Sequence, residues 1–330
     1  MQVLSNLSRR QIIRFLLLFA GASFSVADVA RAQSYPARPL RILVGYAPGG
    51  VNDILARLAG QWLSDRLGQP VVVENRSGAA SNIATEMVVR APNDGYTLLL
   101  AGTSNVINTS LYSRLNFNFS TDIDPVATIS RIPYVLVVNP QIPALSIEEF
   151  IAHAKSRPGR ISMASAGHGS PTHVAGELFK MMSSIDLLHV PYKGGSEALA
   201  DVLAGHVQIY FASTASAMEY VKSGKLRALG VTSVVRVGAL PEIAPIADSL
   251  PGYEASSWYG LVAPKGTPAD IIDRLQKEIS AGLTNEKFVA RLTALGGTPL
   301  TSTPTEFGRL IGEETEKWHK VVKFSGAKVE

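Results

Sequence analysis

The sequence of 330 residues contains no cysteine. This absence excludes disulfide bonds, a thiol nucleophile, cysteine-ligated metals and a lipidated N-terminal cysteine. Charged residues are also scarce, at 18%. Four of the 31 basic residues but only one of the 27 acidic residues lie in the first 32 positions, so the rest of the chain is close to neutral. A nearly neutral chain lacks the excess of basic residues that binds nucleic acid, and we expect no such partner.

Long apolar runs are missing outside the N-terminus. There, Ser8-Arg9-Arg10 precedes the apolar run 15–22, and Ala30-Arg31-Ala32 has the small-x-small pattern of a signal-peptidase site. The run is shorter than the roughly 20 residues that a membrane-spanning helix needs. We therefore expect residues 1–32 to be a cleaved signal peptide and the mature protein to be periplasmic. Residues 8–14 fit both an ordinary secretory signal and a twin-arginine signal, so the export route stays open.

The motifs of common enzymes are missing as well. The sequence has no G-x-S-x-G and no G-x-x-x-x-G-K-[ST], and Thr172 interrupts the G-x-G-x-x-G that Gly167 and Gly169 begin. Its six histidines include no H-E-x-x-H and no pair spaced by four residues. We therefore expect no catalytic residue, no metal site and no cofactor. A periplasmic serine hydrolase using Ser170 with His168 or His173 is the enzymatic alternative.

The rest of the sequence alternates short apolar runs with amphipathic segments, which predicts strands and helices in turn. Strands are expected at 40–46, 71–74, 97–101, 161–164, 187–190, 207–211 and 226–231. Helices are expected at 52–67, 81–90, 146–157 and 196–204, after Ser170, and over most of 268–323. Such alternation predicts parallel sheets covered by helices on both faces, and the number of elements predicts two domains. Segments 127–138 and 257–264 are the candidate crossings between them.

Local signals mark several helix ends. Ser170 followed by Pro171 is typical of a helix start, and Ser146 with Glu149 forms the pattern of a capping box. Gly205 follows the last apolar position of its helix and predicts a helix end there.

Four turns rich in small residues each follow an expected strand and precede an expected helix. In open parallel sheets ligands bind at this edge, and the free N–H groups of helix N-termini attract anions. Any single glycine is explained by turn geometry alone, but four such turns together favour a site for a small acidic ligand. The turns are Pro48-Gly49-Gly50, Gly78-Ala79-Ala80-Ser81, Ser165 to Ser170, and Tyr192-Lys193-Gly194-Gly195-Ser196.

An ordered set of segments resembles the substrate-binding proteins of tripartite tricarboxylate transporters, also called the Bordetella uptake gene family. The segments are Tyr35-Pro36 with Pro39 to Ile42, Tyr46 to Asp53, Val73 to Arg76, Ala91 to Leu98, His189 to Gly194, and Trp258 to Pro268. The resemblance implies an α/β, two-lobed periplasmic-binding-protein fold of the Venus-flytrap, type II-like kind. Each lobe is then a mainly parallel sheet flanked by helices, joined by two crossing segments. The expected lobes are 33–133 with 260–330, and 134–259.

The resemblance further implies a monomeric, non-catalytic receptor that captures a small organic or aromatic carboxylate and delivers it to membrane permease subunits. A ligand-loaded partner of a sensor is the other alternative. Ala212 stands where many relatives have an aspartate, which disfavours an amino-acid ligand. Loop positions that match the family's ligand contacts are Gly49, Gly50, Ala80, Ser81, Thr103, Ser104, Gly169 and Ser170, and the fourth turn adds Tyr192 and Lys193. We expect backbone N–H groups and hydroxyls to hold the carboxylate, with Lys193 secondary.

Overall fold

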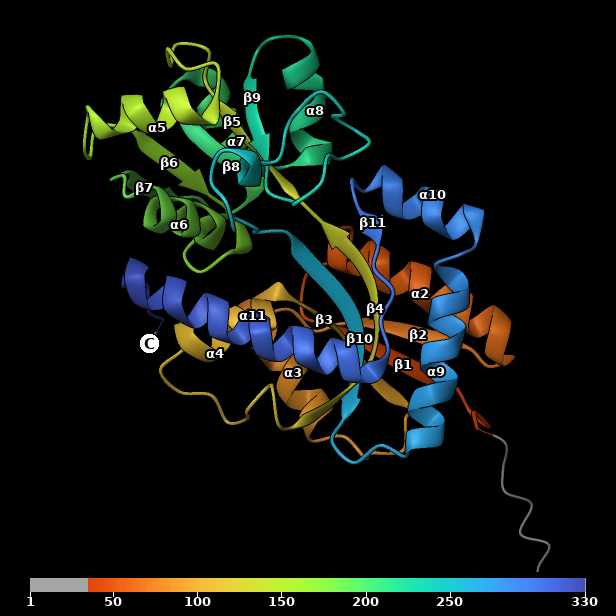
Figure 1. The fold of residues 1–330 in the computed structure, drawn as a ribbon. Coiled ribbons are helices and arrows are strands. Elements are labelled where there is room, and N and C mark those ends of the chain that lie inside the picture. Colours follow the sequence, from red (N-terminus) through yellow and green to blue (C-terminus); the bar gives the residue numbers. More distant parts are fainter. Residues whose placement is uncertain (1–34, 330) are drawn as a thin grey trace, which may run out of the picture. The chain divides into compact units, whose positions relative to one another are not determined.

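Two β-sheets organise the chain from Arg38 onward in the computed structural model, which describes residues 35–329 (Figure 1). The expected signal peptide, 1–32, lies outside the described residues. The six-stranded sheet has the order β11-β4-β10-β3-β1-β2, and the five-stranded sheet has the order β7-β6-β8-β5-β9. The strands are β1 Leu40–Val44, β2 Val71–Asn75, β3 Thr97–Gly102, β4 Ile123–Ile132, β5 Tyr134–Val138, β6 Ser162–Ser165, β7 Leu188–Pro191, β8 Ile209–Ser213, β9 Arg227–Val231, β10 Ser257–Pro264 and β11 Thr298–Pro299.

Helices flank both sheets. The first lobe comprises the six-stranded sheet with α2–α4 and α9–α11, and the second comprises the five-stranded sheet with α5–α8 (Figure 1). The helices are α2 Val51–Leu67, α3 Asn82–Val89, α4 Thr103–Leu111, α5 Ile147–Lys155, α6 Pro171–Ser183, α7 Gly195–Ala204, α8 Thr214–Lys222, α9 Ala269–Gly282, α10 Glu286–Ala294 and α11 Pro304–Ser325. Two 3₁₀ turns, η1 Ala79–Ser81 and η2 Ile246–Asp248, complete the set. The expected two-lobed α/β architecture is confirmed.

The strands that arrive from the other lobe make both sheets mixed. In the first sheet β10 lies between β3 and β4 and is antiparallel to both. In the second sheet β5 lies between β8 and β9 and is antiparallel to both. The β1-β2, β1-β3, β6-β7 and β6-β8 pairs are parallel, as expected. The sequence indicated 127–138 and 257–264 as crossing segments but did not predict their antiparallel pairing, because pairing partners far apart in the chain leave no local signal.

The two connections between the sheets lie side by side. Pro133 alone separates β4 from β5, and the second connection runs from β9 back to β10. Tyr134 N–H donates to Thr232 Oγ1 at 2.8 Å, and Thr232 N–H donates to the Tyr134 carbonyl at 2.9 Å. Ser257, at the start of β10, is paired with Ile132 at the end of β4. The backbone that links the lobes is therefore a hydrogen-bonded pair of strands.

Packing between the lobes involves the C-terminal helix. Helix α11 lies beside α4 of its own lobe and beside α6 of the second lobe (Figure 1). One hydrophobic core includes Leu43 and Trp318 from the first lobe together with Phe179 and Phe211 from the second. Burial of such side chains stabilises the fold by roughly 1.5–3 kcal/mol each. The lobes thus share apolar contacts on the α11 side.

Local signals were borne out where they were strong. Ser146 Oγ accepts from Glu149 N–H at 3.2 Å, and Gly205 ends α7 in the left-handed conformation. The segment 268–323, expected to be almost wholly helical, contains three helices and the short strand β11, which pairs with β4. Within residues 35–329, none of the helices combines the length and apolarity needed to cross a bilayer.

Candidate functional site

A cavity of about 370 Å³ lies between the lobes. Both lobes contribute to its wall, and all of the lining side chains are uncharged. The lining residues are Tyr46, Val51, Asn52, Gly102, Thr103, Ser104, Asn105, Tyr134, Ala166, Ser170, Pro171, Thr172, Gly195, Ser257 and Tyr259. A ligand held here would contact the first lobe and the second lobe at once.

Four helices begin at this cavity. Val51 starts α2 and Thr103 starts α4 on the first lobe, while Pro171 starts α6 and Gly195 starts α7 on the second. The first N–H groups of a helix have no partner within it, and the helix dipole places partial positive charge at the same end. Two such ends face the cavity from each side. The cavity therefore offers positive potential and hydrogen-bond donors without a cationic side chain.

Three tyrosine side chains line the same cavity. Burial raises the pKa of the Tyr46, Tyr134 and Tyr259 phenols above their ordinary value. The Tyr134 hydroxyl lies 2.7 Å from Ser257 Oγ, which also hydrogen-bonds Tyr259, and Tyr46 hydrogen-bonds Ser104. Since the phenols keep their protons at neutral pH, each carries a hydroxyl that can donate to an anion.

Of the ten predicted ligand residues, Thr103, Ser104 and Ser170 line the cavity. Thr103 is buried, and its Oγ1 accepts from Trp258 N–H at 3.0 Å, which ties the start of α4 to β10. Ser104 is the partner of the Tyr46 phenol. The structure thus brings the predicted positions 103, 104 and 170 together across the two lobes.

Ser170 is the N-cap of α6, as the sequence predicts. Its Oγ accepts from His173 N–H at 3.3 Å and donates to the Gly167 carbonyl at 2.7 Å. The hydroxyl proton is therefore engaged within the loop, and contact with a ligand as a donor requires the hydroxyl to rotate.

Gly169 belongs to the same loop and is buried. Its N–H donates to His173 Nδ1 at 3.0 Å, and its φ is +68°. A Cβ at this position would collide with the Leu111 side chain at the end of α4. Gly169 thus permits a close approach of the second lobe to the first, while its N–H is engaged by an imidazole.

Gly49 and Gly50 lie just before α2, next to the lining residues Val51 and Asn52. Gly49 N–H donates to Asp53 Oδ2 at 2.9 Å, and Gly50 is the N-cap. The other Asp53 oxygen accepts from Asn75 Nδ2 at 2.9 Å, and the same amide donates to the Tyr46 carbonyl at 3.0 Å. The loop 46–50 is therefore tied to the buried Asp53 carboxylate directly at Gly49 and through the Asn75 amide at Tyr46.

A nearby guanidinium affects that carboxylate. Arg57, one turn along α2, lies 2.9 Å from Asp53 Oδ1. Its hydrogen bond to the carboxylate, assisted by the N–H of Gly49 and the amide of Asn75, lowers the pKa of Asp53 to about 2. Asp53 is thus ionised at every physiological pH.

The loop that holds Ala80 and Ser81 is strained. Ala79, Ala80 and Ser81 all have positive φ, a conformation that costs roughly 1–3 kcal/mol per non-glycine residue. Ser81 is buried against Gly45, where a Cβ would collide with the Ser81 side chain. The Ala80 carbonyl accepts from Asn108 Nδ2 at 2.7 Å. Neither Ala80 nor Ser81 lines the cavity.

Tyr192 and Lys193 lie outside the lining of the cavity. The Tyr192 hydroxyl donates to Asp201 Oδ2 on α7 at 2.6 Å, and burial raises the pKa of this phenol to about 12. Lys193 is exposed, and its backbone N–H donates to Glu197 at 3.2 Å. Their structural part is to shape the turn before α7.

Sequence reasoning missed several lining residues, above all Tyr46, Asn105, Tyr134, Ser257 and Tyr259. Tyr134 and Ser257 belong to the crossing strands, so only the fold brings them to the cavity. Tyr46 was the one with an available signal, since it ends the apolar run before the Pro48 turn. Its position at the carboxyl end of a parallel strand predicts that Tyr46 lies at the ligand-binding edge of the sheet.

Three imidazoles gather beneath the cavity. The rings of His173 and His189 stack, with centroids 3.8 Å apart and planes at 19°, and His168 lies edge-on to both. The closest donor atoms lie within 4.8 Å of one another. Imidazole lone pairs lie in the ring plane, so two stacked rings do not direct them at one ion. The arrangement does not fit a metal site without ring rotation.

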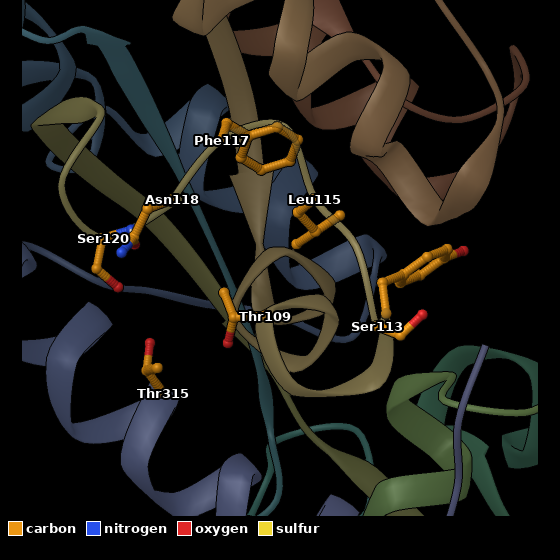
Figure 2. Close-up of a pocket in the computed structure, with 8 residues that line it drawn as sticks. Thr109, Ser113, Leu115, Phe117, Asn118, Ser120 and Thr315 are labelled. Carbon is orange, nitrogen blue, oxygen red and sulfur yellow. The ribbon is translucent and has the colours of Figure 1, made fainter. Parts of the chain in front are cut away.

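A second hollow of about 390 Å³ lies on the first lobe, between α4, the loop 112–122 and α11 (Figure 2). Thr109 and Thr315 lie at the two helices, and both hydroxyls donate to carbonyls of their own helix at 2.7 Å. None of the predicted ligand residues lines it. We therefore locate the candidate site in the cavity between the lobes.

Comparison with known proteins agrees with this architecture. A family model described as the tripartite tricarboxylate transporter family receptor matches residues 55–326. Protein BugT of Bordetella pertussis is 36% identical over 311 residues, covering 93% of this chain and 95% of the relative. The chain belongs to this receptor family. The expected resemblance is thereby confirmed, and the family comprises extracytoplasmic solute-binding receptors.

Solved structures of relatives share the fold. The periplasmic binding protein BugD is 32% identical with a TM-score of 0.74, over 90% of this chain and 100% of that protein. The structure of Rpa4515 of R. palustris with adipate is 33% identical with a TM-score of 0.77, over 89% of this chain and 100% of that protein. This receptor therefore has the two-lobed periplasmic-binding-protein fold.

Proposed function

We propose that this chain captures a small organic or aromatic carboxylate in the cavity between its lobes and delivers it, chemically unchanged, to the membrane permease of a tripartite tricarboxylate-type transporter. The observation that carries the proposal is the arrangement of four helix N-termini around a cavity whose lining side chains are all uncharged. Such a site suits an anion and gives a cation nothing to pair with. The adipate in Rpa4515 supports the choice of a carboxylate.

Neutral donors hold the carboxylate in this proposal. Backbone N–H groups at the helix starts and the hydroxyls of Ser104, Ser170 and Tyr46 are among the groups that line the cavity. Gly49, Gly50, Ala80, Ser81 and Gly169 act by shaping the loops that present them. Lys193, which is exposed, contributes only long-range attraction.

The wider organisation follows the same proposal. Residues 1–32 direct export to the periplasm and are removed, by the general secretory or the twin-arginine route. The lobes divide into 33–133 with 260–330, and 134–259. The mature chain acts as a monomer that closes over its ligand, because a ligand that contacts both lobes stabilises the closed state.

The absence of catalysis is part of the proposal. The Ser170 hydroxyl donates to a carbonyl, not to an imidazole, so the serine–histidine pair of the enzymatic alternative is not formed in this structure. Ser165 Oγ does lie 2.7 Å from His189 Nε2, but Ser165 is fully buried. Burial and the neighbouring imidazoles lower the pKa of His189 to about 3, which makes it a weak base.

The test uses the mature chain beginning at Gln33. Native mass spectrometry of freshly purified protein should show a bound acid, and calorimetry should show binding of adipate, malate, benzoate or terephthalate. Adipamide is the matched neutral control and should bind at least tenfold more weakly than adipate. Equal binding of adipamide would contradict an anion site, and a change in ligand mass after incubation would indicate an enzyme.

The transport role has its own test. Deleting the gene should abolish uptake of the identified acid, and restoring the mature domain with its signal should recover it. Normal uptake in the deletion strain, with loss of an acid-dependent transcriptional response, would favour the sensor partner instead.

A further inference from the structure

The histidine cluster fastens one loop of the cavity wall. Loop 165–170 supplies Ala166 and Ser170 to the cavity, and Gly169 contacts Leu111 of the first lobe. Two imidazoles bind this loop on its inner side. Gly169 N–H donates to His173 Nδ1 at 3.0 Å, and Ser165 Oγ lies 2.7 Å from His189 Nε2.

The first of these bonds fixes a protonation state. A backbone N–H can only donate, so His173 Nδ1 must carry a lone pair. The ring proton is then on Nε2, which lies 3.6 Å from Glu177 Oε1. Adding a second proton to His173 would break its bond to Gly169. The loop is therefore held by the neutral ring only.

We propose that His173 and His189 are positioning residues for the ligand-facing loop 165–170, that the bond from Gly169 to His173 requires a neutral ring, and that proton uptake by the cluster frees the loop and weakens ligand binding. Only the statement about ligand binding rests on the proposed function. The attachment of the loop stands on the contacts within the second lobe.

The surroundings of the cluster oppose charge. His189 is half-buried and stacks on His173, so a proton on His189 would be poorly hydrated and close to a second imidazole. Glu177 favours a proton, but it is already paired with Lys180 at 3.0 Å. Burial, then His173 and His168, lower the pKa of His189 to about 3. The charged and titratable groups around the two rings are His168 on the loop, Glu177 and Lys180 on α6, and on β8 the Tyr210 phenol, which hydrogen-bonds Thr172.

The sign of the effect follows. A detached loop leaves the His189 imidazole hydrated, with a pKa near the ordinary value of 6.5. The attached state binds fewer protons, so lower pH favours detachment from about pH 6.5 downward. For one proton, the detached population rises about tenfold between pH 7.5 and 5.5. Above pH 7.5 it should not change.

Hydrogen exchange measures the loop without any ligand. The amides of 165–170 in the mature chain, corrected for intrinsic exchange, should lose protection about tenfold between pH 7.5 and 5.5. His189→Gln keeps an amide that can bond Ser165 and removes a titrating group, so its profile should be flatter. His206→Gln, at an exposed ion pair with Asp201, is the matched control and should retain the wild-type profile.

A second measurement keeps the inference testable if the variants unfold. Nitrogen-15 chemical shifts should show His173 as the Nε2–H tautomer at pH 7.5, where the loop is attached. A loop whose protection does not depend on pH in the wild type would overturn the proposal, as would a charged His173 with Gly169 still protected. If the loop responds as expected but no carboxylate binds, the proposed function fails and the attachment stands.

Discussion

At the scale of single residues, Ser170 and Lys193 separate two ways of holding an anion. Ser170 lines the cavity and caps α6, whereas Lys193 is exposed and outside the lining. Ser170→Ala should weaken carboxylate binding about tenfold, because a hydroxyl bonded to a charged ligand is worth roughly 1.5–3 kcal/mol. It should also reduce the free energy of unfolding by about 1 kcal/mol through loss of the cap.

Lys193→Ala provides the contrast. It should change affinity less than twofold and mainly reduce the dependence of binding on salt. Calorimetry at two salt concentrations, with denaturant unfolding in parallel, measures both variants. If Lys193→Ala abolished binding and Ser170→Ala left it unchanged, a direct ion pair would hold the ligand.

Asp53 acts on the cavity through the loop 46–50. Gly49 N–H, the Asn75 amide and Arg57 all donate to this carboxylate. In Asp53→Asn the new amide N–H₂ group would face at least one of these donors. The loop should loosen, and carboxylate affinity should fall several-fold. Asn75→Asp is a companion variant that would place two carboxyl groups together. It should reduce carboxylate affinity more than Asp53→Asn does.

The pH dependence of Asp53 has a definite sign. Its pKa in the folded protein, about 2, lies below the ordinary value of 3.8. The stabilisation is therefore fully present above about pH 4 and is lost as the pH falls towards 2. It amounts to about 1 kcal/mol, because the exposed Arg57 is screened by solvent. Unfolding of wild type and Asp53→Asn should converge at pH 2; a constant difference between them would contradict this account.

At the scale of elements, the predictable parts were those specified by neighbouring residues. The start of α6 at Ser170-Pro171 and the ends of α2 and α7 at glycines depend on backbone geometry within one turn of helix. Helix α4 was missed because its cap is Gly102, whose N–H bonds Asn105, and its polar sequence has weak periodicity. The antiparallel position of β10 could not be predicted, because it depends on partners in β3 and β4.

The candidate site also has a part that could be predicted from neighbouring residues and a part that could not. The strand-to-helix turns could be located from glycine and serine, and one of them supplied Ser170. Thr103 and Ser104 came only from the family resemblance. The phenols of Tyr46, Tyr134 and Tyr259 come from three distant strands or strand ends, and no spacing in the sequence joins them. Burial, which keeps these phenols protonated, is likewise a property of the packed lobes.

At the scale of the whole receptor, the proposed closure depends on the fit of Gly169 against Leu111. Gly169→Ala would place a methyl group into the Leu111 side chain and would strain a residue with φ of +68°. We expect the variant to remain more open with a saturating carboxylate, seen as a larger radius of gyration by small-angle scattering. In the double variant, Leu111→Ala should relieve the clash and restore the compaction. If Gly169→Ala alone became as compact as the wild type on binding ligand, the fit of Gly169 against Leu111 would not control closure.

The insertion of β10 has a consequence for how the chain matures. The five-stranded sheet is complete once β9 ends at Val231, whereas the six-stranded sheet lacks a central strand until residue 264 is available. Until then β3 and β4 each present an unpaired edge, the kind of surface that promotes association with other chains. During N-to-C synthesis or threading across a membrane, the lobe that begins first is the one that finishes last. A chain truncated before Ser257 would keep the second sheet intact and leave the first open at its centre.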